Sequence, residues 1–199
     1  GNDAANGGTG PSDAFQTIQK AIDTVNVGGE IRVLPGTYDQ DEKNGVDNVT
    51  DGPGPYQFNL WVNKDITIQG VTVGDIEITD PNAAVAIIKP KRDVPVFGTS
   101  AMFILADGVT VTGVKFVSDN GTAFADKTIE VIGNDVTIDG VAFDVTGGAV
   151  GVYIGDFSYD ASNDVSTIAD YTITNSGFTS TDQTGMAFQA ANGAGWPDN

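Results

Sequence analysis

Residues 65–73, DITIQGVTV, place two short runs of β-branched residues on either side of Gly70. The pattern returns at residues 109–116 (VTVTGVKF) and 135–143 (DVTIDGVAF), and in a degraded form at residues 170–178 (DYTITNSGF). β-branched side chains favour strands, and an internal glycine is typical of a corner. Each copy therefore predicts a strand, a corner and a second strand.

The threonines of the pattern lie 43, 27 and 35 residues apart, at Thr67, Thr110, Thr137 and Thr172. A period in the twenties with insertions of variable length is typical of a β-solenoid, whose coils contact only their neighbours. A β-sandwich with strands at similar spacing is the alternative, although it gives no reason for one segment to recur. We therefore expect an all-β solenoid, with helix scarce.

Alternation along a strand predicts which side chains form the core. Ile66 and Ile68 should point inward and Thr67 outward, and Val71 and Val73 should point inward after the corner. Stacking should align Ile66 with Val109, Val136 and Tyr171 in an inner column. The four threonines should form an outer column.

Residues 12–25 predict one short helix near the start of the chain. Pro11-Ser12-Asp13 supplies capping groups and an acid for the positive end of the helix dipole. The apolar stripe consists of Phe15, Ile18, Ile22 and Val25. A single helix before a series of strands is suited to cover the open end of the solenoid.

Residues 13–23 (DAFQTIQKAID) and 28–38 (GGEIRVLPGTY) resemble the entrance of right-handed parallel β-helix proteins of the pectate-lyase-like superfamily. The resemblance implies that the helix caps the N-terminal end and that the segment Pro35-Gly36-Thr37-Tyr38 closes the first coil. We expect one right-handed parallel β-helix domain over residues 1–199, as a segment of a longer chain. The superfamily includes lyases, hydrolases, esterases and adhesins, so fold alone does not give the activity.

The composition excludes several functional classes. Lys and Arg total 9 against 27 Asp and Glu, a net charge of −18, which argues against binding of nucleic acid or of an anionic membrane surface. Without His or Cys, the chain cannot form a Cys/His zinc site, a Ser-His-Asp triad or a disulfide. No apolar run is long enough to span a membrane. We expect a secreted or cell-surface protein, with polysaccharide or other surface components as partners.

Carboxylates are densest in residues 39–57, which predict a long acidic loop. Calcium prefers oxygen ligands, so the loop acids are candidate calcium ligands, and a solvated loop is the alternative. The candidates are Asp39, Asp41, Glu42, Asp47 and Asp51. Asp65, Asp135 and Asp170 precede the repeated strand, where they could bridge cations between coils or form Asx turns.

Two hypotheses for function follow. Aromatic faces stack on sugar rings, and the candidate carbohydrate-binding residues are Tyr56, Trp61 and Tyr153. Packing of Trp61 against a neighbouring loop is the alternative for that residue. A non-catalytic adhesive or carbohydrate-contacting module, which could also associate end to end, is favoured because the complete catalytic residue sets of the superfamily's enzymes are missing. The alternative is a lyase of uronate polysaccharides that acts by calcium-assisted β-elimination, as the resemblance implies, with Lys115 as the candidate base.

Overall fold

The computed structural model describes residues 4, 6–38, 57–89, 99–119, 127–146, 150–155, 170–180 and 186–190. The described residues are mostly β, as the composition predicts, and form three parallel sheets. The helical elements are η1 (Pro11–Asp13), α1 (Ile18–Thr24) and η2 (Pro81–Ala83). None of these described helices has both the length and the apolar character of a transmembrane helix.

The strands fall into three series, each containing every third strand of the chain. Sheet A contains β1 (Glu30–Val33), β4 (Thr67–Gly70), β7 (Thr110–Thr112), β10 (Thr137–Asp139) and β13 (Thr172–Thr174). Sheet B contains β2 (Gly36–Tyr38), β5 (Ala86–Ile88), β8 (Lys115–Asp119), β11 (Ala142–Thr146) and β14 (Gly177–Thr179). Sheet C contains β3 (Gln57–Val62), β6 (Thr99–Ile104), β9 (Lys127–Val131), β12 (Val150–Ile154) and β15 (Met186–Ala190).

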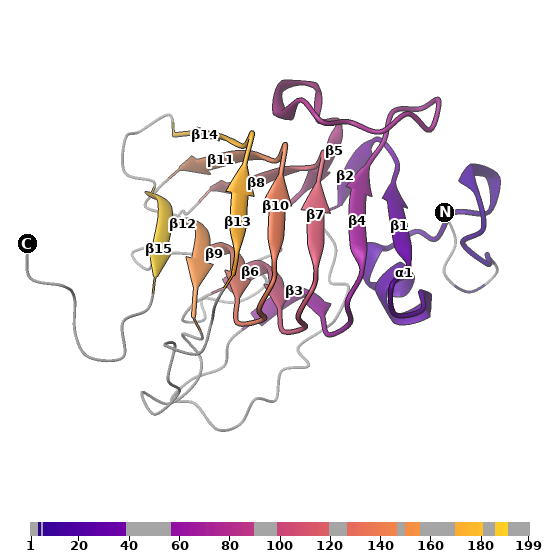
Figure 1. Cartoon of the computed structure of the whole chain (residues 1–199). Helices are drawn as coiled ribbons and strands as arrows, with labels where there is room; N and C mark the ends of the chain where they lie inside the picture. Colours follow the sequence, from indigo (N-terminus) through magenta and orange to yellow (C-terminus); the bar gives the residue numbers. More distant parts are fainter. Residues whose placement is uncertain are drawn as a thin grey trace, which may run out of the picture.

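The chain visits sheets A, B and C in turn, and Figure 1 shows the strands of sheet A side by side along the molecule. Every pair of neighbouring strands in the three sheets is parallel. The arrangement is consistent with the predicted solenoid. It argues against the antiparallel sandwich.

The register of sheet A confirms the predicted threonine column. Thr67 pairs with Thr110, Thr110 with Thr137, and Thr137 with Thr172. On the opposite face, Ile68 pairs with Val111, and both side chains are fully buried. The repeat thus specifies both the order of the coils and the faces of the strands.

The interior of the coils is filled by stacked side chains. Phe143 of β11 lies between Phe116 of β8 and Phe178 of β14, with ring centroids 5.7 Å and 4.6 Å away. Both ring pairs are close to parallel. Because each coil covers the one before it, Phe116 and Phe143 are buried, whereas Phe178 in the last described coil is half-buried.

The helix α1 is shorter than the predicted segment 12–25, and it begins at Ile18. Its N-cap is Thr17, whose side chain accepts a hydrogen bond from the Lys20 amide. Asp13 cannot serve this helix because its carboxylate accepts from the Gly7 amide and the Thr9 hydroxyl. The expected docking is confirmed for Ile18 and Ile22 of α1, which belong to the buried core, and Val25 packs against it. Phe15 lies before the helix and outside this cluster, contrary to the predicted stripe.

Two residues expected in the interior are exposed. Val73 is 84% exposed because the chain turns away from the coil, with the Thr72 amide donating to the Ile76 carbonyl. After this turn the chain runs back, and Glu77 pairs with Val71 in an antiparallel bridge. Tyr171 is 41% exposed because the strand that follows it, β13, is the last described strand of sheet A. The inner column therefore ends at Val136.

The glycine corners are confirmed at the turn from sheet A to sheet B. Gly113 and Gly140 have φ values of 65° and 62°, in the left-handed region that favours glycine. A Cβ at Gly113 would collide with the Ile78 carbonyl, and one at Gly140 with the Thr79 carbonyl. The insertion after β4 therefore packs directly on these corners.

Candidate functional site

Aromatic side chains form a column on the outer face of sheet C. The register aligns Trp61 with Phe103, Phe103 with Glu130, and Glu130 with Tyr153. The neighbours of Trp61 along β3, Leu60 and Val62, are buried in the core, so the column has the outward parity predicted for Trp61. Two of the three predicted carbohydrate-binding residues, Trp61 and Tyr153, are thus brought into one column, but Tyr153 is only 6% exposed.

The capping helix fixes the backbone at Trp61. The Trp61 amide donates to the Gln19 side-chain oxygen at 2.8 Å, and the Gln19 amide group donates to the Trp61 carbonyl at 3.3 Å. Gln19 is itself buried on α1. The Trp61 ring meets the Phe103 ring edge-on at 5.3 Å and is half-buried. Trp61 is therefore the most accessible aromatic ring of the column and is held from two sides.

A buried polar cluster, which we call the sheet C cluster, includes Glu130 and Tyr153 of this column together with Ser100 and Lys127. The Lys127 ammonium is 3.9 Å from the Glu130 carboxylate, and their side chains are 5% and 2% exposed. The Ser100 hydroxyl donates to the same carboxylate oxygen at 2.9 Å. Lys127 also lies 4.7 Å from the centroid of the Tyr153 ring, a cation–π contact.

The sheet C cluster is costly for the fold, because taking charges out of water is unfavourable unless they are paired and hydrogen-bonded. The neighbouring Thr128 hydroxyl is buried and has no hydrogen-bond partner among the residues that the structure describes. Charged side chains on a solvent-exposed face are hydrated by water and need no such pairing. The outer face of sheet C therefore differs from an ordinary solvated surface: its described outward side chains are buried except for Trp61, which is the part of this face that a ligand can reach.

Sequence reasoning did not identify Gln19, Lys127 or Glu130. A signal was present for Glu130, which stands between the apolar residues Ile129 and Val131 at an outward position of its strand. The segments from sheet B to sheet C have different lengths, so the sequence did not align Glu130 with Trp61.

Lys115 lies on sheet B, whereas Trp61 and the sheet C cluster lie on sheet C. Its ammonium is 3.5 Å from the Asp144 carboxylate of the next coil, and their side chains are 34% and 31% exposed. The described surroundings of Lys115 thus provide an ion pair between coils. A catalytic role for Lys115 stays a prediction.

The five predicted calcium ligands and Tyr56 lie outside the described residues. Within the described ranges, no group of three or more Asp and Glu side chains is arranged to hold a metal ion. The recurrent aspartates have turn geometry instead: Asp135 and Asp170 have φ values of 53° and 60°, the left-handed conformation that aspartate tolerates in turns. The amides two residues on, those of Thr137 and Thr172, donate to the Val109 and Val136 carbonyls instead of to the aspartates, so Asp135 and Asp170 are turn residues without the hydrogen bond of an Asx turn.

Comparison of the chain with models of protein families, with curated proteins and with solved structures finds no match. The function must therefore be inferred from the site itself.

Proposed function

We propose that this chain is a right-handed parallel β-helix of the pectate-lyase-like kind that acts as a non-catalytic module at or outside the cell surface. It contacts polysaccharide through Trp61, because Phe103, Glu130 and Tyr153 of the same outer column are buried. The resemblance of residues 13–38 to that superfamily and the three parallel sheets support the fold. The net charge of −18 and the lack of cysteine are compatible with the location.

The observation that carries this proposal is the fixed, accessible Trp61 ring. An indole presents a large apolar face at low cost in conformational entropy, and sugar rings have apolar faces that stack on it. The Gln19 hydrogen bonds and the Phe103 contact hold Trp61 in place before any ligand arrives. Preorganisation of this kind reduces the entropy that binding must overcome.

Tryptophan fluorescence tests this proposal directly. Trp61 and Trp196 are the two tryptophans of the chain, so a Trp196→Phe variant leaves Trp61 as the single reporter. Titration with soluble neutral glucan, xylan and polygalacturonate should shift the Trp61 emission for at least one polymer. Introducing Trp61→Ala should weaken retention of the protein in a gel containing that polymer by about tenfold.

Tyr171→Ala is the matched control, because Tyr171 is an exposed aromatic residue just before β13 of sheet A. It should leave retention unchanged. The proposal fails if no polymer changes the Trp61 emission, or if Trp61→Ala binds as tightly as the parent protein.

The alternative lyase activity stays a prediction, as does calcium binding by the loop acids. The same preparations can be followed for the absorbance of unsaturated uronate products, with calcium and with a chelator. A calcium-dependent rise that Lys115→Met abolishes would favour the enzyme over the binding module.

A further inference from the structure

The first strand of sheet A has a free edge. β1 pairs with β4 and with no other described strand. The Gly29 and Val33 carbonyls accept hydrogen bonds from Thr67 and Val71, so these alternate residues of the β1 segment face β4. The backbone groups of Glu30 and Arg32 consequently face the other edge, where the described structure offers them no partner.

The N-terminal segment beside this edge is bonded to itself rather than to β1. The Asn6 side chain donates to the Ala14 carbonyl, and the Gly8 amide donates to the Asp13 carbonyl. Hydrogen bonds from the Gly7 amide and the Thr9 hydroxyl lower the pKa of the Asp13 carboxyl below its ordinary value, which keeps it charged and bonded at neutral pH. The segment is therefore closed without using the edge of β1.

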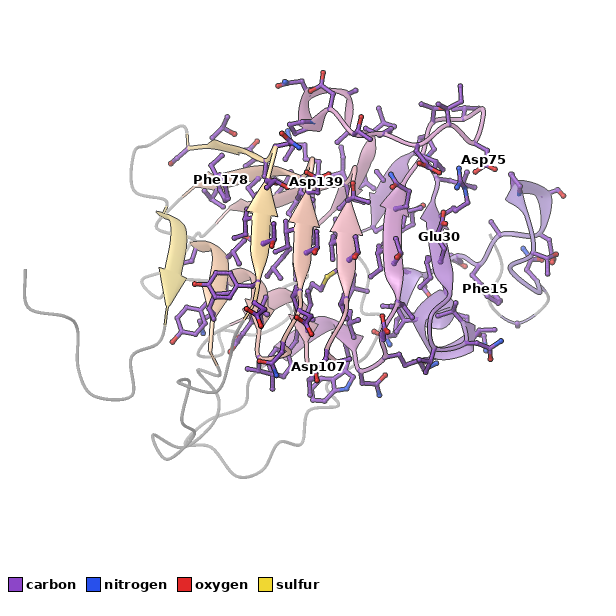
Figure 2. All side chains as sticks on the ribbon, in the orientation of Figure 1. Phe15, Glu30, Asp75, Asp107, Asp139 and Phe178 are labelled. Atoms are coloured by element: carbon purple, nitrogen blue, oxygen red, sulfur yellow. The ribbon has the colours of Figure 1, made fainter. Side chains whose placement is uncertain are left out.

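A cavity of about 710 Å³ is lined by both the N-terminal segment and β1. Gly8, Thr9 and Phe15 line it from the segment, and the consecutive residues 30–35 line it from the β1 side. Figure 2 shows Phe15 beside the N-terminal segment, Glu30 on β1 and Asp75 at the same end of the molecule. The four residues of β1, Glu30–Val33, span about 13 Å, which is enough to pair with a short added strand.

One side of the cavity is lined by apolar side chains and the other by charged ones. Phe15, Val25 and Ile31 are apolar lining residues. On the outer side, the Arg32 guanidinium contacts Glu30 at 2.8 Å, Asp75 at 2.7 Å and Glu77 at 3.3 Å. One cation therefore faces three carboxylates, and a surplus of negative charge remains along this edge. Successive side chains of an added strand would point to opposite faces: those on one face would contact the apolar groups, and those on the other face would contact the carboxylates.

We propose that the free edge of β1 binds an extended peptide segment in which basic and apolar side chains alternate, as an additional strand of sheet A. Strand addition uses backbone hydrogen bonds for affinity and alternate side chains for specificity. Glu30 and Arg32 provide the backbone groups, and the Glu30 and Asp75 carboxylates, which line the cavity, select the basic side chains. This interaction is independent of polysaccharide binding on sheet C.

Calorimetric titration with synthetic peptides of alternating lysine and valine tests the proposal. One peptide is methylated at the amides of its lysines and another at the amides of its valines, which removes the backbone donors along one edge or the other. Only one of the two should lose binding, because only one edge faces β1. A glutamate–valine peptide should bind at least about tenfold more weakly than the lysine–valine peptide.

Two variants at position 30 separate the contribution of the backbone amide to binding from that of the side-chain charge. Glu30→Pro removes the amide that faces the cavity, at a strand position where proline is tolerated, and should abolish binding. Glu30→Gln keeps that amide and should weaken binding only about threefold. Thermal melts check that both variants are folded.

The proposal is overturned if both methylated peptides bind equally, if charge reversal has no effect, or if Glu30→Pro binds like Glu30→Gln. It is also overturned if the protein binds none of the peptides, including the case in which it dimerises in sedimentation experiments through an interface that Glu30→Pro disrupts. In that case the edge accepts a second copy of the chain.

Discussion

Replacing Ile22 with aspartate is expected to lower the free energy of unfolding by about 4 kcal/mol or more. The Ile22 side chain is fully buried on α1, in the same core cluster as Ile31 and Val62. The substitution removes this apolar contact and buries a carboxylate without a partner. It also detaches the helix that holds the backbone at Trp61 through Gln19. Urea unfolding followed by circular dichroism measures the loss.

Thr24→Asp is the matched control for this prediction. It introduces the same charge at the exposed last residue of α1, where the helix contributes little burial. The expected loss is within about 0.5 kcal/mol. Equal losses in the two variants, or an unchanged midpoint for Ile22→Asp, would show that α1 is not docked on the coils.

Replacing Lys127 with methionine is expected to cost about 3 to 5 kcal/mol, because it removes the ammonium that is paired with the buried Glu130 carboxylate. The double variant Lys127→Met with Glu130→Gln removes both charges and should recover most of that loss. Ser100 can still bond the amide group at position 130. Thermal or urea unfolding of the two variants and the parent protein gives the coupling between Lys127 and Glu130.

The same substitution at Lys115 provides the control. The Lys115–Asp144 pair is about one-third exposed, so water screens it and Lys115→Met should cost no more than about 1 kcal/mol. If Lys127→Met is no more destabilising than Lys115→Met, the sheet C cluster is not the buried ion pair described above.

Much of the fold followed from the sequence because a parallel coil places one residue type at one position in every turn. The threonine column and the inward Ile66 and Ile68 could be predicted in this way, and the structure confirms them. The errors at Val73 and Tyr171 have physical causes. Val73 lies in an insertion that leaves the coil, and Tyr171 lies where the described stack ends.

The site was less predictable than the fold. Trp61 was identified because its apolar neighbours give it outward parity. Lys127 and Glu130 were missed because each charge looks like a solvated residue until the register places both beside Tyr153. Gln19 gave no signal, because its hydrogen bonds to Trp61 join residues 42 positions apart. Contacts of this kind depend on how the coils and the helix pack, so they cannot be predicted from the composition or from local sequence patterns.

The stacking of successive coils in register underlies both proposed surfaces, and disulfide trapping tests it most directly. The chain has no cysteine, so two introduced thiols are the only ones present. Thr110→Cys with Thr137→Cys places them on adjacent strands, about 5 Å apart, within reach of a disulfide. Thr110→Cys with Thr172→Cys places them two strands apart, about 10 Å, which is beyond reach. We expect mild oxidation to cross-link the first pair in the monomer and to leave the second pair reduced. Cross-linking of the second pair, or of neither pair, would contradict the stacked coils.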